Sequence, residues 1–310
     1  MFNPLKFIFN IEQCTPSHNA FSLLGIKIKF LKPEIRKERK AISEYYRSFK
    51  SVQDIPEAGG NLRVIQKANA KFLSNFDKFC TENSLEYWLD FGTLLGTIRH
   101  KGFIPWDDDL DISMLRDDYN RIIELANAGA FNNTDFCLKF ENNGKNKCFI
   151  KIQHQKFKNL FIDIFPYDIY NKSNLTEEEK NKLSLLIAEK HKQNLLFINN
   201  NEIKMLKHFA DITSNEILND KPLDKTQKPA IFMGIDFPQG SFKVYNWDEI
   251  FPLKRMNFEG YDLLVPNSPE KVLNCLFGNY MTLPKDCYPR HSDYVNLATQ
   301  ELRSYISDNE

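Results

Sequence analysis

A short, almost wholly apolar run, LFIDIF at residues 160–165, constrains the fold of this chain more than any other feature. Asn159 and Pro166 bound the run, and only Asp163 interrupts it. A strand that is apolar on both faces must be covered on both faces, so the run predicts a central strand of a sheet. A charge is costly in such a strand, so Asp163 needs a structural partner, a metal ion or a hydroxyl proton.

Segments with helix or strand periodicity surround this run. We expect helices at 61–82, 117–129 and 176–199, a further helical stretch to about residue 217, and a helix at 268–278. We expect strands at 85–91 and 107–115, a hairpin through the NNG turn between 136–140 and 147–152, and a hairpin at 254–266. Because strands and helices mix without regular β–α–β alternation, we expect an α+β fold rather than a doubly wound sheet.

The first sixty residues differ from the rest. In LLGIKIKF, apolar residues alternate with lysines, which predicts a half-buried strand, and we expect a hairpin within residues 7–31. The charged segment 33–50 predicts a helix, and Pro56 with Gly59 and Gly60 marks its end. A chain of 310 residues has room for one large domain or two modest ones. We therefore expect an N-terminal unit at 1–60 and a main domain at 61–310.

Composition excludes several classes of protein. Lysine plus arginine equals aspartate plus glutamate at 41 each, so no global positive field exists to hold nucleic acid. No apolar run is long enough to span a membrane, and the first residues lack the pattern of a secretory signal. The six cysteines form no C-x-x-C pair. We expect a cytoplasmic protein with reduced thiols and no nucleic-acid partner.

Carboxylates cluster in PWDDDLDISM, where Asp107, Asp109 and Asp111 lie two residues apart. If the segment is a strand, alternate side chains share one face, and these carboxylates converge. Like charges repel unless a cation neutralises them, and hard oxygen ligands favour Mg²⁺ or Mn²⁺ over zinc. A solvated acidic turn is the alternative. An EF-hand loop is excluded because Ile112 occupies the position that requires glycine.

Upstream, FGTLLG follows the strand expected at 85–91 and begins a helical turn. Backbone N–H groups at Gly92 and the hydroxyl of Thr93 can face a phosphate there. A glycine turn, then carboxylates on a strand, then Asp163 on a later strand is an order that resembles the nucleotidyltransferase fold of the polymerase-beta type. Such sites hold one or two magnesium ions that bridge phosphate oxygens during in-line displacement at phosphorus.

Longer motifs carry a closer resemblance. YWLDFGTLLGTIRHKGFIPWDDDLDISM resembles the signature of the LicD family, the cholinephosphotransferase-like proteins that include fukutin and fukutin-related protein. FIDIFPYD resembles the second motif of that family, and LFGNYMTLP followed by His291 resembles its C-terminal motif, so the resemblance covers roughly residues 62–291. It implies a nucleotidyltransferase-like fold with a mixed sheet, flanking helices and added helical segments.

The resemblance also implies an activity, the transfer of a phosphorylated alcohol from a CDP-activated donor to a hydroxyl of a surface glycan. The alcohol would be choline or an alditol such as ribitol, and the glycan a lipopolysaccharide, a capsule or a teichoic acid. The expected partners are therefore the CDP-activated alcohol and a glycan or glycolipid acceptor, with the protein associated peripherally with the inner membrane face.

By the same resemblance, Asp109 and Asp111 are metal ligands for Mg²⁺ or Mn²⁺, and Asp107 acts beside them through water. Asp163 is either a ligand or the base that accepts the acceptor hydroxyl proton. Gly92 and Thr93 match the phosphate-facing turn.

Four further residues match family positions near substrate. Arg99 would clamp a phosphate and Lys101 would supply a point charge, with a solvated loop as the alternative. Trp106 would stack on cytosine or enclose a choline headgroup, with core packing as the alternative. His291 would reach the site from the C-terminal part of the chain, with an exposed surface position as the alternative.

Other function classes use similar residues. A nucleotidyltransferase would use the same metal site and release pyrophosphate instead of CMP. A metal-dependent glycosyltransferase also has spaced aspartates but does not need Asp163 or the glycine turn. A glycan-binding protein with a relic site would bind metal without turnover.

Overall fold

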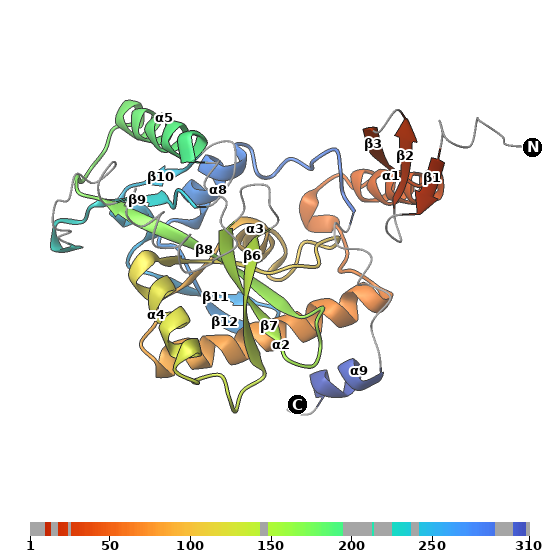
Figure 1. The fold of residues 1–310 in the computed structure, drawn as a ribbon, viewed down its shortest axis with the longest axis horizontal. Helices are drawn as coiled ribbons and strands as arrows, with labels where there is room; N and C mark the ends of the chain where they lie inside the picture. Colours follow the sequence, from red (N-terminus) through yellow and green to blue (C-terminus); the bar gives the residue numbers. More distant parts are fainter. Residues whose placement is uncertain are drawn as a thin grey trace, which may run out of the picture.

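The computed structural model describes residues 10–13, 18–23, 26–142, 148–194, 213, 225–236, 242–288 and 300–307. Its main feature is a mixed sheet of seven strands (Figure 1). The strands are β4 (Trp88–Leu89), β5 (Asp111–Leu115), β6 (Phe136–Asn142), β7 (Cys148–His154), β8 (Phe161–Tyr170), β9 (Ala230–Met233) and β10 (Val244–Tyr245). This α+β architecture with a mixed sheet confirms the fold class expected from the sequence.

Strand β8 is the central strand, as the LFIDIF run predicts. It pairs in parallel with β5 along one edge, and its other edge pairs antiparallel first with β7 and then with β9. The sequence placed the end of this strand at Pro166, and that boundary is wrong, because β8 continues to Tyr170. Pro166 lies between the stretches of β8 that pair with β7 and with β9, so the sheet does not need the backbone N–H that proline lacks. The Pro166 carbonyl accepts a hydrogen bond from the Gly234 amide at 2.8 Å.

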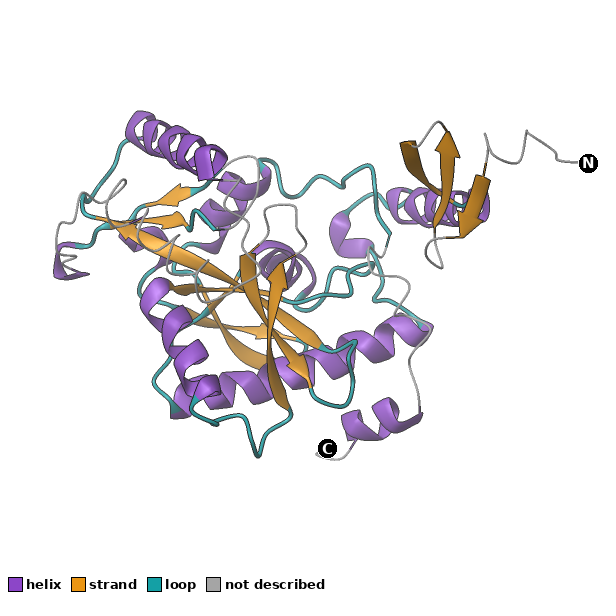
Figure 2. Cartoon of the chain, in the orientation of Figure 1, coloured by secondary structure: helices purple, strands orange, loops and turns teal. Residues whose placement is uncertain are grey.

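Helices flank this sheet (Figure 2). They include α2 (Gly60–Glu82), α3 (Phe91–His100), α4 (Arg116–Asn127) and α5 (Glu177–Asn194). On α2, the apolar spacing that predicts the helix gives fully buried Phe72 and Phe76, and both pack against Phe136 of β6. Thr176 and Glu179 form reciprocal side-chain to backbone hydrogen bonds at the start of α5, the capping box that the sequence indicates.

The strand expected at 85–91 is shorter in the structure, where only Trp88 and Leu89 pair. Asp90 ends it because its carboxylate accepts a hydrogen bond from the Phe91 amide and caps α3. The expected helices at 61–82, 117–129 and 268–278 are confirmed within one or two residues. Of the helical stretch expected from 195 to 217, only residue 213 is described, and the turn residues 143–147 between β6 and β7 lie outside the described residues.

The C-terminal part of the described chain adds α7 (Trp247–Ile250), β11 (Lys254–Phe258), β12 (Tyr261–Val265), α8 (Pro269–Phe277) and α9 (Gln300–Ser307). Single 3₁₀ turns occur at Val52–Asp54 and Lys225–Gln227. Strands β11 and β12 form the expected hairpin, and its turn at Glu259 and Gly260 has φ angles of +54° and +90°.

The N-terminal segment contains three antiparallel strands, β1 (Asn10–Gln13), β2 (His18–Leu23) and β3 (Ile26–Leu31), followed by α1 (Pro33–Arg47). The expected hairpin is thus β2 and β3, and β1 is an additional strand. Helix α1 contacts the main body, since the Tyr46 ring lies 4.8 Å from that of Trp106 and Ser43 accepts from the Cys287 amide at 3.1 Å. The division at residue 60 stays a prediction. None of the described helices is both long and apolar enough to cross a bilayer.

An arginine connects α4 to β8 and to the residues that follow β9. Arg116, the first residue of α4, donates two hydrogen bonds to Asp168 of β8 at 2.8 and 2.9 Å and two to Asp236 at 2.8 Å. Both carboxylates are buried, so their charges depend on this guanidinium.

We therefore expect Arg116→Met to lower the free energy of unfolding by about 3 to 5 kcal/mol, because it leaves two buried carboxylates unpaired. Urea denaturation measures this change. Arg121→Met, on the exposed face of the same helix, is the control and should stay within about 0.5 kcal/mol of the parent. Equal effects of the two substitutions would contradict the role given to Arg116.

Candidate functional site

An acidic cluster forms where the chain enters β5. One ligand atom from each of Asp107, Asp108 and Asp109 lies within 4.8 Å of the others. The prediction that 107–111 is one strand with alternating carboxylates is wrong, because only Asp111 belongs to β5. The preceding residues form a loop that Leu110 anchors in the core, and this loop brings the carboxylates together without strand alternation. Asp108, which the sequence analysis did not single out, belongs to the cluster.

The pairing of β5 with β8 adds a further carboxylate. Asp111 and Asp163 are register partners across this parallel pair, so their side chains lie on the same face of the sheet. The Asp163 amide donates to the Leu110 carbonyl at 2.8 Å, which fixes the register at this end. The structure therefore brings together the four aspartates that the sequence proposed: Asp107, Asp109, Asp111 and Asp163.

Burial and mutual repulsion raise the pKa of these groups. Burial raises the pKa of Asp111 well above its ordinary value, and the charges of Asp109 and Asp163 raise it further. Burial, followed by the charge of Asp109, raises the pKa of Asp107 in the same direction. Burial raises the pKa of Asp163 to about 6, and the nearby Lys151 opposes that rise. A cluster of this kind is stabilised by a cation.

The donors of this cluster are all carboxylate oxygens. Hard oxygen ligands suit Mg²⁺ or Mn²⁺ better than zinc. The residues present therefore fit the metal ion expected from the sequence, since Asp107, Asp108 and Asp109 are close enough together to hold one, and ligation by Asp111 and Asp163 stays a prediction.

The first turn of α3 packs directly against the cluster. A Cβ atom at Gly92 would lie 2.7 Å from Asp107 Oδ2 and 3.6 Å from Asp111 Oδ2, so any side chain at this position would displace the Asp107 carboxylate. The Gly92 amide points at Asp111 Oδ2 at 3.4 Å, and Thr93 Oγ1 accepts from the Asp111 amide at 2.8 Å. Gly92 and Thr93 thus support Asp111, and their contact with a phosphate stays a prediction.

Asp90 lies behind the cluster and was missed by the sequence analysis. Its fully buried carboxylate accepts from Ser113 Oγ at 2.7 Å, from Tyr167 Oη at 3.0 Å and from the Phe91 amide. Burial raises the pKa of Asp90 to about 6, against the effect of these hydrogen bonds. Its backbone amide donates to the Asp111 carbonyl at 3.1 Å. The position of Asp111 is therefore fixed from β4, α3 and β8 together.

Lys151 is the third residue that sequence reasoning missed. Its Nζ lies 3.2 Å from Asp163 Oδ1 and 3.4 Å from Glu141 Oε1, and 3.9 Å from the centre of the Phe161 ring. Lys151 stands opposite Asp163 in the β7–β8 register. Knowledge of the strand register would have identified Lys151, because a carboxylate and a lysine directly opposite each other on neighbouring strands form a cross-strand ion pair.

The basic residues of the first motif do not join the cluster. Arg99, His100 and Lys101 lie at the other end of α3, about 12 Å from Gly92 at 1.5 Å per helical residue. Arg99 is only 6% exposed, and its Nη2 donates to the Thr282 carbonyl at 3.1 Å. This bond connects the first motif to LFGNYMTLP, the third, and places Arg99 at a separate cavity.

Two expected substrate contacts have other surroundings. Trp106 is 7% exposed and packs against Tyr46, which matches the core-packing alternative, and its stacking on a base stays a prediction. His291 lies outside the described residues.

Comparison with known proteins agrees with the motifs. Residues 84–199 match the family model described as LicD/FKTN/FKRP, nucleotidyltransferase domain. The lipopolysaccharide cholinephosphotransferase LicD of Haemophilus influenzae is 28% identical over 260 residues, which are 74% of this chain and 96% of that protein. Human ribitol 5-phosphate transferase FKRP is 30% identical over 83 residues, 27% of this chain and 17% of that protein.

The matched residues 84–199 include β4, α3, the acidic loop, β5 and β8, and therefore every carboxylate of the cluster. The fold, the motifs and the matches agree, and the part of the chain that carries this acidic cluster is similar to the LicD/FKTN/FKRP nucleotidyltransferase domain.

Proposed function

We propose that this protein transfers a phosphorylated alcohol from a CDP-activated donor to a hydroxyl group of a glycan. The observation that carries the proposal is the acidic cluster in a LicD-type domain, with Asp111 and Asp163 side by side on paired strands. The similarity to a lipopolysaccharide cholinephosphotransferase over 74% of the chain supports this class of donor and acceptor. Choline phosphate or an alditol phosphate is the group transferred.

In this reaction the acceptor oxygen attacks the β-phosphorus of the donor, the bond to CMP breaks, and the hydroxyl proton passes to a base. A divalent metal ion, when bound, would neutralise charge on the phosphate oxygens. Asp109 and Asp111 would hold this ion, with Asp107 beside them. The carboxylate of Asp163 is available for the acceptor proton, and Lys151 holds that carboxylate in position.

The proposal includes the place of the reaction. An acceptor built on a membrane lipid would be met at the inner face of the cytoplasmic membrane, by peripheral association. The cytoplasmic location expected from the sequence stays a prediction.

Turnover tests the function directly. Purified protein with Mg²⁺, glycan acceptor and CDP-choline, CDP-ribitol, CDP-glycerol or CDP-ethanolamine should release CMP with one of these donors. Asp109→Asn removes a charged ligand and should lower the rate by roughly 10³-fold. Asp117→Asn, at an exposed carboxylate on α4, is the matched control and should retain the rate.

Other products would change the assignment. Release of pyrophosphate would identify a nucleotidyltransferase. Metal binding without turnover of any donor would identify a glycan-binding relic. A parental rate in Asp109→Asn at saturating Mg²⁺ would remove Asp109 from the metal site.

Stability without metal should depend on pH through Asp111. The pKa of Asp111 is raised in the folded state, so the folded protein holds this proton at pH values where the unfolded chain has already lost it. The free energy of unfolding therefore falls as pH rises above about 4, the ordinary pKa of an aspartate. In EDTA, Asp111→Asn should therefore gain melting temperature relative to the parent as pH rises from 4.5 to 7. Added Mg²⁺ should raise the melting temperature of the parent and not of the variant. Parallel pH curves for the two proteins would contradict this account.

Asp163 is expected to act both near the metal and toward the acceptor. Asp163→Asn should therefore weaken Mg²⁺ binding moderately in a calorimetric titration while transfer collapses. Loss of transfer with unchanged affinity would assign Asp163 as a base alone. An active variant with parental affinity would remove it from the site.

A further inference from the structure

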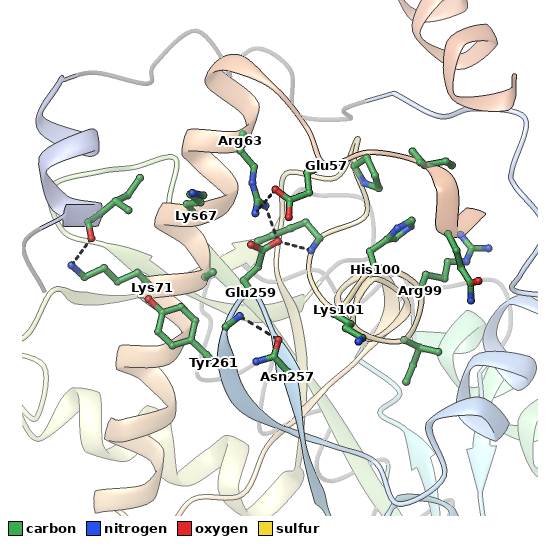
Figure 3. A pocket seen from close by; sticks show the side chains of 18 residues that line it. Glu57, Arg63, Lys67, Lys71, Arg99, His100, Lys101, Asn257, Glu259 and Tyr261 are labelled. Carbon is green, nitrogen blue, oxygen red and sulfur yellow. Dashed lines mark hydrogen bonds and ion pairs between the residues drawn. The ribbon is translucent and has the colours of Figure 1, made fainter. Parts of the chain in front are cut away.

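A cavity of about 740 Å³ is lined by residues at the C-terminal end of α3, and Figure 3 shows their side chains. The acidic cluster lies against the first turn of the same helix. The walls of the cavity come from α2, from the last turn of α3 and the residues after it, from the turn between β11 and β12, and from α9. This volume is typical of small-molecule sites. The cavity is rich in cations: Arg63, Lys67, Lys71, Arg99 and Lys101.

The two carboxylates in the wall are both engaged by one arginine. Arg63 lies 2.9 Å from Glu57 Oε2 and 2.8 Å from Glu259 Oε1. Glu259 also accepts from the Phe103 amide at 3.0 Å, and the absence of a side chain at Gly102 lets its carboxylate reach that position. These contacts leave the other cations of the wall without a carboxylate.

Those cations have no ion-pair partner within the described ranges. Lys67 and Lys101 are exposed at the cavity. Arg99 is 6% exposed, and its buried Nε has no hydrogen-bond partner among the described residues. Lys71 is 7% exposed and donates to the carbonyls of Tyr305 and Ile306 at 2.5 and 3.3 Å. A buried cation without a counter-ion is costly, so the cavity attracts an anion.

Helix ends explain only part of this arrangement. Arg99 and Lys101 complement the negative end of α3, and Lys71 does the same for the last carbonyls of α9. Lys67 lies within α2 and serves neither helix end, yet it lines the same cavity. Cations from α2 and from the end of α3 thus line one space, which is the arrangement that binds phosphate groups.

We propose that this cavity binds the phosphate groups of a phosphorylated ligand, as an anion site separate from the acidic cluster. The five cations exceed the two carboxylates of the wall by three charges, which suits a diphosphate or a sugar phosphate. The site does not need the metal ion, because the protein itself supplies the positive charge. It extends beyond the proposed transfer reaction and can be tested separately from it.

Calorimetric titration with inorganic pyrophosphate tests the site. The experiment uses the full chain in EDTA, because the metal-free acidic cluster repels anions and the basic cavity does not. The parent should bind pyrophosphate, and Asp109→Asn should bind it with the same affinity. The double variant Lys67→Gln/Lys101→Asn should bind at least about tenfold more weakly, since it removes two charge-assisted contacts.

The substitutions are chosen to preserve the fold. Both lysines are exposed, and asparagine tolerates the left-handed conformation of Lys101, where φ is +56°. Lys78→Gln, at an exposed position of α2 away from the cavity, is the control and should bind as the parent does. Absence of binding in EDTA, parental affinity in the double variant or an equal loss in Lys78→Gln would overturn the proposal.

Discussion

The parallel pairing of β5 with β8 places Asp111 beside Asp163, and the rest of the site depends on this contact. Two carboxylates on one buried face repel each other, so the surrounding structure must hold them in place. The apolar residues next in the two strands, Ile112 and Ile164, are fully buried and in register, and they supply the burial that keeps the strands together. The core thus stabilises an arrangement that its own charges oppose.

Compensating contacts surround each carboxylate. Lys151 approaches Asp163 from β7, and the amide of Gly92 with the hydroxyl of Thr93 supports Asp111 from α3. Asp90 anchors the turn between β4 and α3 through three hydrogen bonds. Phe91, in this turn, has a φ of +43°, a conformation that costs free energy and is found at functional sites. The backbone strain at Phe91 and the repulsion between the aspartates occur at the same place, which is typical of functional sites.

Sequence reasoning recovered the central strand, the long helix α2 and the clustered aspartates other than Asp108, because each has a local signal. The alternation argument named Asp107 and Asp109 for a wrong reason and passed over Asp108, since these residues lie in a loop whose path depends on the buried Leu110. Lys151 and Asp90 could not be found in the same way. Their roles follow from strand register and from hydrogen bonds between distant segments, which a single sequence does not display.

The separation of Arg99 and Lys101 from the acidic cluster has a related cause. The motif is contiguous in the chain, but α3 extends it over about 12 Å, so its acidic and basic parts face different spaces. Carboxylates lie near the positive end of α3 and cations near its negative end, and both arrangements stabilise the helix. A metal-free acidic cluster repels phosphate while the basic cavity attracts it. The helix therefore separates a carboxylate cluster from a cavity rich in cations, and in our proposals only the carboxylate cluster requires a metal ion to accept a phosphate.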